Sequence, residues 1–270
     1  IKALIKHCIY TFFFFSGDTI VLREEVFLRM KKKFNSSFNS DTFIIYLNKL
    51  IDCSEIIAID EYISLYEFYD TERNILSNIN RISNITDSIS DDKIKKELEK
   101  YEKKYSIEFG VDQIEAITGA IKNNFYIITG GPGTGKTTII KAIVNLLESV
   151  CKIDKKDIAL LAPTGRSAKR MMQSVGVSAY TIHKFLKWNK ENGTFQIDEY
   201  NKAQEKVIIV DEASMVDIFL FNSLLKGLKL NVKLLLIGDE NQLPSIGPGD
   251  LLHDLLRMSH LKNKYLPKHL

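Results

Sequence analysis

The sequence predicts an α/β protein in which a parallel-sheet domain follows a small, mainly helical module. From residue 110 onward, short and almost wholly apolar segments alternate with longer helical ones, as expected for strands that are buried on both faces. A glycine-rich loop joins one of these segments to a helical run. The earlier residues show helical periodicity with two short β-like pieces. We therefore expect a helical module at residues 1–106 and a sheet domain at residues 107–270.

The elements of the helical module follow from apolar periodicity and polar interruptions. We expect helices at Phe43–Ile51 and Leu65–Ile82, and short strands at Thr19–Leu22 and Ile56–Ile59. The polar stretches Asn35–Asp41 and Ser83–Asp92 are rich in turn and N-cap residues, so they are interpreted as connections. Small helices with a short hairpin indicate a winged-helix-like or an irregular helical module.

A charged helix is expected at residues 91–105, between the module and the sheet domain. Ile94, Leu98, Tyr101 and Tyr105 lie on one stripe of this helix. A surface helix that docks by this stripe is favoured over a role in nucleic-acid binding. The sheet strands that follow are expected at Phe125–Thr129, Ile158–Leu161, Val207–Val210 and Leu234–Ile237.

Composition excludes several classes of protein. A length of 270 residues allows one or two domains, and 45% apolar with 26% charged residues excludes a disordered or collagen-like chain. The net charge of +3 permits a polyanionic partner without demanding one. Cys8, Cys53 and Cys151 are far apart and form no CxxC motif, so we expect a reduced, cytoplasmic protein without structural zinc.

The start of the chain carries two further expectations. It begins with Ile1 rather than methionine, which suggests a piece of a longer polypeptide. The apolar stretch from Ile9 to Phe15 is short, is interrupted by Thr11 and lacks a small-x-small cleavage site. A buried helix is therefore favoured over a signal peptide. No segment reaches the roughly 18 apolar residues of a membrane span, so no membrane association is expected.

The strongest motif follows the first expected strand of the sheet domain. Residues 130–138 read GGPGTGKTT and satisfy the pattern G-x-x-x-x-G-K-[ST] between a strand and a helix. Such a loop turns its backbone N–H groups toward phosphate oxygens, and the following helix adds the positive end of its dipole. A glycine-rich turn without a ligand is the disfavoured alternative. The expected ATP-binding residues are Gly131, Pro132, Gly133, Thr134, Gly135, Lys136, Thr137 and Thr138.

Each residue type in this loop has a definite chemical role. The ammonium of Lys136 can bridge the β- and γ-phosphates, so it is also a candidate catalytic group. The hydroxyl of Thr137 can complete the coordination shell of Mg²⁺. The sequence therefore predicts an ATP site with magnesium as the accompanying cation.

A pair of carboxylates ends the third expected strand, in the segment VIIVDEASMVD. Asp211 and Glu212 are placed at the carboxyl edge of the sheet, where active sites of open α/β sheets lie. Asp211 would hold magnesium, and Glu212 would take a proton from the attacking water. A strand-end Asp-Glu pair by itself is more often a helix N-cap, and it gains its meaning from following a phosphate loop. An adjacent base favours a hydrolysing motor ATPase over a small-molecule kinase.

A third polar strand end occurs in the segment LLLIGDENQL, from Leu234 to Leu243. Gln242 lies a few residues beyond the strand. A neutral amide at this position can bond the γ-phosphate or the attacking water, which couples the state of the nucleotide to the position of the loop. Taken alone, the segment is a hairpin-like turn. The prediction therefore depends on its position in the chain after the phosphate loop and the Asp211–Glu212 pair.

Several strings together resemble the RecD-like (RecD/TraA-type) DNA helicases of superfamily 1. These are GGPGTGKTT, APTGRSAKRM, TIHKFL, VIIVDEASMVD and IGDENQLPSIGPGDLL, in that order. Gln113, within FGVDQIEAI, resembles the glutamine that recognises adenine in this family. The strings GDTIVLREEVF and YISLYEFYDTERNI are similar to the helical module that precedes the motor in longer members. The resemblance covers residues 1–256.

The resemblance implies a RecA-like motor domain and an ATP-dependent DNA helicase, with 5′ to 3′ polarity and roles in DNA repair and recombination. Its implied partners are single-stranded DNA and duplex ends. From the residues themselves, Thr164, Ser167 and backbone amides could hold DNA phosphates, with Arg166, Lys169 or Arg170 nearby. Taken alone, Lys169 and Arg170 are equally consistent with an ordinary helix surface. Thr181 is a plausible N-cap, and His183 either touches DNA or packs. The expected DNA-binding residues are Pro163, Thr164, Gly165, Arg166, Thr181 and His183.

Two departures from the family pattern limit these implications. Asp18 stands where family members have a histidine. After Leu256, neither the next family element, with an arginine for the γ-phosphate, nor a second RecA-like domain follows. The implied partner is therefore the C-terminal RecA-like domain of a parent chain. Two alternatives stay open: a half-motor that binds nucleotide and DNA without unwinding activity, and a motor that acts on RNA.

Overall fold

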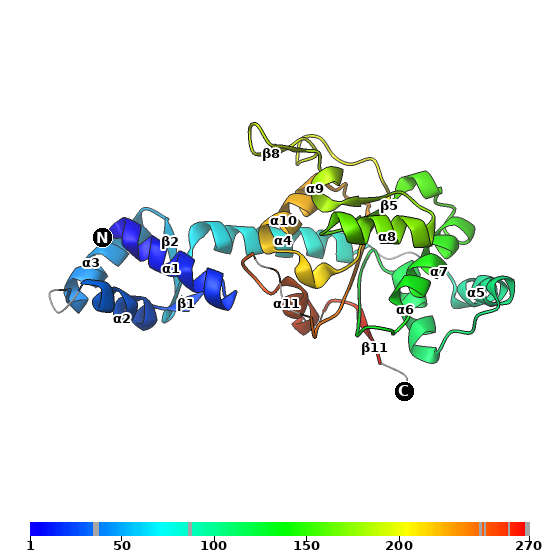
Figure 1. Ribbon diagram of the computed structural model, residues 1–270, viewed down its shortest axis with the longest axis horizontal. Helices are drawn as coiled ribbons and strands as arrows, with labels where there is room; N and C mark the ends of the chain where they lie inside the picture. The colour runs from blue at the N-terminus through cyan, green and yellow to red at the C-terminus, as the bar shows by residue number, and fades with distance from the viewer. Residues whose placement is uncertain (35–37, 86–87, 243–244, 246, 259, 268–270) are drawn as a thin grey trace.

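The computed structural model describes residues 1–34, 38–85, 88–242, 245, 247–258 and 260–267. Parts of the expected connections Asn35–Asp41 and Ser83–Asp92, and Leu243 in the third polar strand end, lie outside the described residues. In Figure 1 a small N-terminal lobe is joined to a larger sheet-containing lobe by one long helix. Among the described residues, no helix is both long enough and apolar enough to span a membrane.

The N-terminal lobe has the element order of a winged-helix domain. Three helices and a three-stranded antiparallel sheet alternate as helix, strand, helix, helix, strand, strand, and the strand order is β1-β3-β2. The small helices and the short hairpin expected from the sequence are thus present, in a winged-helix-like order. Its elements are α1 (Lys2–Ser16), β1 (Val21–Leu22), α2 (Arg23–Phe34), α3 (Ser40–Asp52), β2 (Ile56–Ile59) and β3 (Tyr62–Leu65).

The apolar run near the N-terminus forms a buried helix, as predicted. Ile5 and Ile9 of α1 are inaccessible to solvent, and the ring of Phe13 lies 4.1 Å from that of Phe68. The helix ends at Gly17, which adopts a left-handed conformation with φ of 79°, as glycine does readily at a helix C-cap. Ile5, Ile9 and Phe13 of α1 therefore belong to the core of the small lobe.

The helices α4 (Tyr66–Ser83) and α5 (Asp91–Tyr105) lie on opposite sides of the large sheet, and α4 is the helix that joins the two lobes. The helix α4 packs against α10 (Ile218–Gly227) and β4 (Phe125–Gly130). The helix α5 packs against α7 (Lys136–Ser149). Ile94, Leu98 and Tyr101 of α5 are buried, whereas Tyr105 at the end of the stripe is exposed. The expectation of a surface helix docked by an apolar stripe is confirmed for the first three of these residues.

The large lobe contains a six-stranded sheet in which every described pairing is parallel, with the order β11-β4-β10-β9-β5-β6. The four predicted strands are confirmed, and two strands were not predicted. The short β6 is only half-buried, and β11 carries an asparagine and a lysine, so neither shows the apolar run of a central strand. The strands are β4 (Phe125–Gly130), β5 (Ile158–Ala162), β6 (Ala179–Thr181), β9 (Val207–Val210), β10 (Lys233–Gly238) and β11 (Asn263–Leu266).

Alternating residues of these strands enter two separate apolar cores. Phe125 and Ile127 of β4 join a core that contains α4, α10 and the winged-helix lobe, and Tyr126 and Ile128 join one beneath α5 to α8. The first core is therefore continuous between the two lobes.

The remaining elements of the large lobe are helices, 3₁₀ turns and one hairpin. The helices are α6 (Val111–Lys122), α7 (Lys136–Ser149), α8 (Gly165–Val175), α9 (Ile182–Phe185), α10 (Ile218–Gly227) and α11 (Leu251–Arg257). The 3₁₀ turns are η2 (Lys155–Asp157) and η3 (Ala213–Met215), and the hairpin consists of β7 (Trp188–Asn189) and β8 (Thr194–Phe195).

Candidate nucleotide-binding and hydrolysis site

The glycine-rich loop lies between the end of β4 and the start of α7. Gly133 and Gly135 adopt left-handed conformations, with φ of 82° and 84°, which cost glycine little. The buried Thr134 donates its hydroxyl to the carbonyl oxygen of Gly131 at 3.0 Å, and this bond closes the loop on itself. Pro132 and Gly133 are exposed at the tip. A Cβ built on Gly131 or Gly133 would meet no heavy atom within 4 Å, so the space beside the loop is open.

Lys136, the first residue of α7, is folded back onto this loop. Its ammonium donates to the carbonyl oxygen of Gly131 at 2.8 Å and to that of Gly130. Burial lowers the pKa of Lys136, and the carboxylates of Asp239 and Asp211 oppose that shift. The ammonium is therefore held close to the loop carbonyls and within the field of two acidic strand ends.

Gln113 and the two threonines after Lys136 border the same loop. The side-chain amide of Gln113 donates to the carbonyl oxygen of Thr134 at 3.0 Å and accepts from the backbone N–H of Gly110 at 3.1 Å. A Cβ on Gly135 would lie 2.7 Å from its Nε2 atom, so Gln113 lies directly against the loop. Thr137 and Thr138 are half-buried in the first turn of α7.

Asp211 and Glu212 follow β9, as predicted, but their environments differ. Burial raises the pKa of Asp211, and the backbone N–H of Glu212, which donates to Asp211 Oδ1 at 2.9 Å, opposes the rise. The charges of Lys136 and Arg170 also act to lower this pKa. Glu212 adopts a left-handed backbone conformation, with φ of 55°, which is uncommon for a residue other than glycine, asparagine or aspartate.

The carboxylate of Glu212 is hydrogen-bonded to the first turn of α8. Ser167 Oγ donates to Glu212 Oε2 at 2.5 Å, and Thr164 Oγ1 donates to Ser167 Oγ at 2.8 Å. Thr164 is also the N-cap of α8, since its Oγ1 accepts from the backbone N–H of Ser167 at 3.2 Å. The carboxylate of Glu212 and the first turn of α8 are therefore physically connected.

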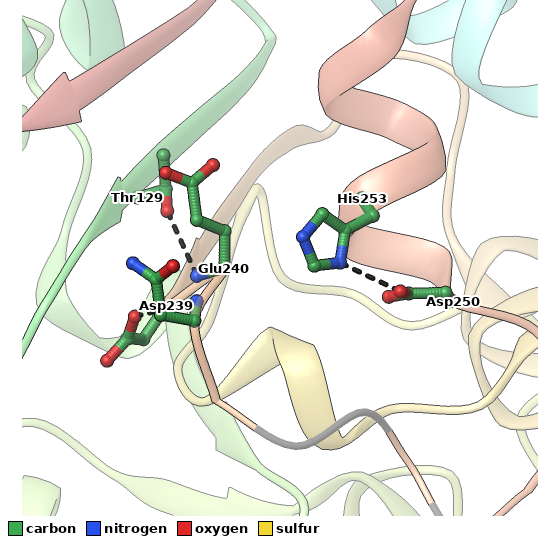
Figure 2. A network of polar contacts seen from close by, with 6 residues as sticks. Thr129, Asp239, Glu240, Asp250 and His253 are labelled. Atoms are coloured by element: carbon green, nitrogen blue, oxygen red, sulfur yellow. Dashed lines mark hydrogen bonds and ion pairs between the residues drawn. The ribbon is translucent and has the colours of Figure 1, made fainter.

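The turn after β10 contributes a buried carboxylate, and Figure 2 shows its contacts. Asp239 is 3% exposed and accepts from the backbone N–H of Asn241 at 3.0 Å, while Thr129 accepts from that of Glu240 at 3.3 Å. Gln242 is exposed, and among the described residues its side-chain amide makes no hydrogen bond. The structure therefore places Asp239 at the site and leaves the Gln242 amide facing solvent.

The residues expected to bind DNA lie at the same edge of the sheet. Because β5 and β6 are parallel and Ala162 pairs with Thr181, the starts of α8 and α9 are neighbours. Thr181 caps α9, accepting from the backbone N–H of Lys184 at 3.1 Å, as predicted. The exposed ring of His183 lies 6.2 Å from Trp188 and 5.9 Å from Phe195. Pro163 is half-buried, and Gly165 and Arg166 are exposed.

Three residues of the site were not recognised in these roles from the sequence. Asp239 ends the strand between β4 and β9, so the rule that parallel strands end at one edge could have identified it. The charge of Arg170 acts to lower the pKa of Asp211, and the hydroxyl of Ser167 donates a hydrogen bond to Glu212. No sequence pattern indicates these last two contacts, because each joins residues that are far apart in the chain.

Residues 113–248 match the family model described as an AAA domain, which covers just over half of the chain. This chain belongs to the AAA domain family. The match begins at the glutamine beside the phosphate loop and includes all three polar strand ends. The expected resemblance to RecD-like proteins is also confirmed, because RecD and RecD2 proteins are among the relatives of this AAA-domain chain.

Those relatives include RecD proteins from several bacteria. The chain is 35% identical over 209 residues to the RecBCD enzyme subunit RecD of Haemophilus influenzae, covering 66% of this chain and 32% of that protein. It is 30% identical over 282 residues to the RecD subunit of Buchnera aphidicola, covering 94% of this chain and 43% of that one. The ATP-dependent RecD2 DNA helicase of Deinococcus radiodurans is 34% identical over 138 residues, covering 51% of this chain and 18% of that one. The chain thus spans less than half the length of these relatives.

Among solved structures, the Pif1 helicase of Candida albicans superposes with a TM-score of 0.46 at 21% identity, covering 61% of this chain and 40% of that one. The α/β fold of this AAA-domain protein is shown by its own six-stranded parallel sheet and by the family match.

Proposed function

We propose that this chain is the ATP-binding part of a DNA helicase in which ATP hydrolysis drives movement along single-stranded DNA. The observation that carries the proposal is that the phosphate loop, the Asp211–Glu212 pair and the start of α8 lie at one edge of one parallel sheet. Ligands of open α/β sheets bind at this carboxyl edge. The RecD and RecD2 relatives support the same function.

In this proposal, ATP binds in the open space beside the glycine-rich loop. The loop amides and the start of α7 would hold the phosphates, and Lys136 would leave the loop carbonyls to bridge the β- and γ-phosphates. Gln113 would recognise adenine. It lies against the loop already, held by Thr134, so its amide is fixed before a nucleotide arrives.

The residues at the loop and at the strand end fit magnesium. Thr137 supplies a hydroxyl and Asp211 a carboxylate, which are oxygen ligands that Mg²⁺ prefers. Asp211 has a pKa raised by burial, so a cation would stabilise its ionised form. When bound, Mg²⁺ neutralises charge on the β- and γ-phosphates. Glu212 would accept the proton of the attacking water, and Gln242 would turn inward to bond the γ-phosphate or that water.

The DNA would cross the exposed starts of α8 and α9. Thr164, Gly165 and Arg166 would contact backbone phosphates, with Pro163 shaping the turn, and Thr181 and His183 would extend the path along α9. We propose 5′ to 3′ movement and a role in DNA repair and recombination by analogy with RecD-like proteins. Three widely spaced cysteines support a cytoplasmic location.

A second RecA-like domain is proposed to complete the nucleotide site. Arginines that reach the γ-phosphate from a neighbouring domain typically supply about 10³–10⁵ of the rate in related phosphoryl-transfer sites. The second candidate function is a half-motor that binds nucleotide and DNA with little turnover. It is supported by the placement of the glycine-rich loop and Asp211 at the edge of one sheet, where nucleotide binding needs no second domain.

The test is a comparison of wild type with Glu212→Gln. ATP binding should persist in the variant while hydrolysis falls by at least about a hundred-fold, because the amide keeps the shape but accepts no proton. Equal hydrolysis by the two proteins would exclude Glu212 as the base. A strand-displacement assay on a 5′-tailed duplex separates the two candidates, because ATP-dependent unwinding by these 270 residues alone would refute the half-motor.

A further inference from the structure

We propose that Ser167 is a positioning residue that restrains Glu212, and that a nucleic-acid phosphate at the start of α8 releases this restraint. The inference rests on the proposed function and assigns to it a regulation of hydrolysis by the bound strand. Ser167 lies on α8, whereas Glu212 follows β9, so the contact between them joins the proposed DNA surface to the proposed base.

The position of Glu212 is set by its backbone. Its left-handed conformation, with φ of 55° and ψ of 40°, is accompanied by the bond from its own N–H to Asp211 Oδ1. Because of this turn, the two neighbouring carboxylates have different contacts. Glu212 bonds Ser167 on α8, while Asp211 interacts with the charge of Lys136. The conformation is an uncommon one for glutamate, and such conformations persist where surrounding contacts hold them.

The contacts that hold Glu212 form a directed chain of hydroxyls. Thr164 donates to Ser167 at 2.8 Å, and Ser167 donates to the Glu212 carboxylate at 2.5 Å. Because each hydroxyl has one proton, Ser167 cannot donate to Glu212 and to another acceptor at once. Bonds in such a chain strengthen one another, and a bond to a carboxylate is stronger than one between neutral groups.

A phosphate oxygen would compete for these protons. Thr164 and Ser167 are only half-buried, and the adjacent Gly165 and Arg166 are exposed, so a backbone phosphate can reach the hydroxyls. A phosphate that accepts the Ser167 proton removes the bond to Glu212, and one that accepts the Thr164 proton weakens it. Glu212 is then free to turn toward the attacking water, which makes hydrolysis dependent on the bound strand.

The experiment measures steady-state ATP hydrolysis with and without a single-stranded oligothymidylate, in wild type, Ser167→Ala and Ser167→Thr. We expect Ser167→Ala to raise kcat without the oligonucleotide by at least about ten-fold at unchanged KM, the lower limit expected for loss of one hydrogen bond to a charged group. Stimulation by the oligonucleotide should shrink by the same factor. Ser167→Thr keeps the hydroxyl and should restore the wild-type dependence. Ser174→Ala is the matched control, because Ser174 lies on the same helix and bonds only the backbone of α8.

The outcomes separate this inference from the proposed function. If Ser167→Ala lowers kcat equally with and without the oligonucleotide, Ser167 supports the active position of Glu212 and the restraint is refuted. If Ser167→Ala changes nothing while Glu212→Gln abolishes hydrolysis, the inference fails and the proposed function stands. If wild type does not hydrolyse ATP, or Glu212→Gln hydrolyses it normally, the proposed function fails and the inference fails with it.

Discussion

Replacing Lys136 by alanine tests the phosphate loop with the least disturbance to the fold. In the protein its ammonium bonds two loop carbonyls, and those two bonds would be exchanged for bonds to the β- and γ-phosphates. Losing two charge-assisted bonds, partly compensated by water, corresponds to about 3 kcal/mol of nucleotide binding. The dissociation constant for ATP should therefore rise somewhat more than about a hundred-fold.

The stability of the fold should change little in this variant. The alanine removes two hydrogen bonds, but it also removes an ammonium whose pKa is lowered by burial. These contributions oppose each other, so the free energy of unfolding should stay within about 1 kcal/mol of wild type. A loss of nucleotide affinity with an unchanged thermal midpoint would thus identify the ammonium itself as the binding group.

The assay is a fluorescence titration with a labelled ATP analogue, accompanied by thermal unfolding. Lys141→Ala is the matched control, since Lys141 is an exposed lysine on the same helix. In wild type, affinity should also decline as the pH rises, beginning below the ordinary lysine value of 10.5 because burial lowers the pKa of Lys136. If Lys136→Ala binds the analogue as tightly as wild type, the assignment of the phosphate loop is wrong.

Three further substitutions test the surroundings of the site. Asp211→Asn should raise the thermal midpoint at pH 7 while weakening magnesium-dependent nucleotide binding, because burial raises the pKa of this carboxyl and its ionised form costs stability. That gain should shrink as the pH falls and disappear below about pH 4, where aspartate becomes protonated in the unfolded chain as well; equal midpoints at every pH would contradict it. Lys233, which is 3% exposed, donates to two carbonyl oxygens at the end of α6 at 3.0 and 2.7 Å. Lys233→Met should cost about 2–3 kcal/mol in denaturant unfolding, and a cost below about 0.5 kcal/mol would show that these carbonyls find other donors. Gly119→Ala should destabilise the fold by about 1–3 kcal/mol although alanine favours helices, because its Cβ would lie 2.2 Å from the buried ring of Tyr126; a rise in the thermal midpoint would refute this.

Much of the fold could be predicted from the sequence because its information is local. The helix at residues 91–105 and the strand Val207–Val210 were predicted with the bounds that the structure has, since a regular charge pattern and a fully apolar run specify one structure each. The phosphate loop was predictable for a similar reason, because its motif is local and two of its glycines, Gly133 and Gly135, adopt the left-handed conformations that such a turn needs.

The tertiary structure alone decided the remaining features. The strands β6 and β11 are short and partly polar, and they become strands because the edges of a buried parallel sheet offer partners for their backbones. One apolar core contains residues of α4, α10 and the winged-helix lobe. It forms only because the apolar faces of α4 and α10 meet in the folded chain.

At the site itself, the sequence determined which groups are present, and the fold determined which of them meet. Gln113 bonds a loop residue 21 positions away, and Ser167 bonds Glu212 across 45 positions. A hydrogen bond needs two atoms within about 3 Å at a suitable angle, and residue order does not encode that condition. It is met here only because parallel strands end at the same edge of the sheet and bring their loops together.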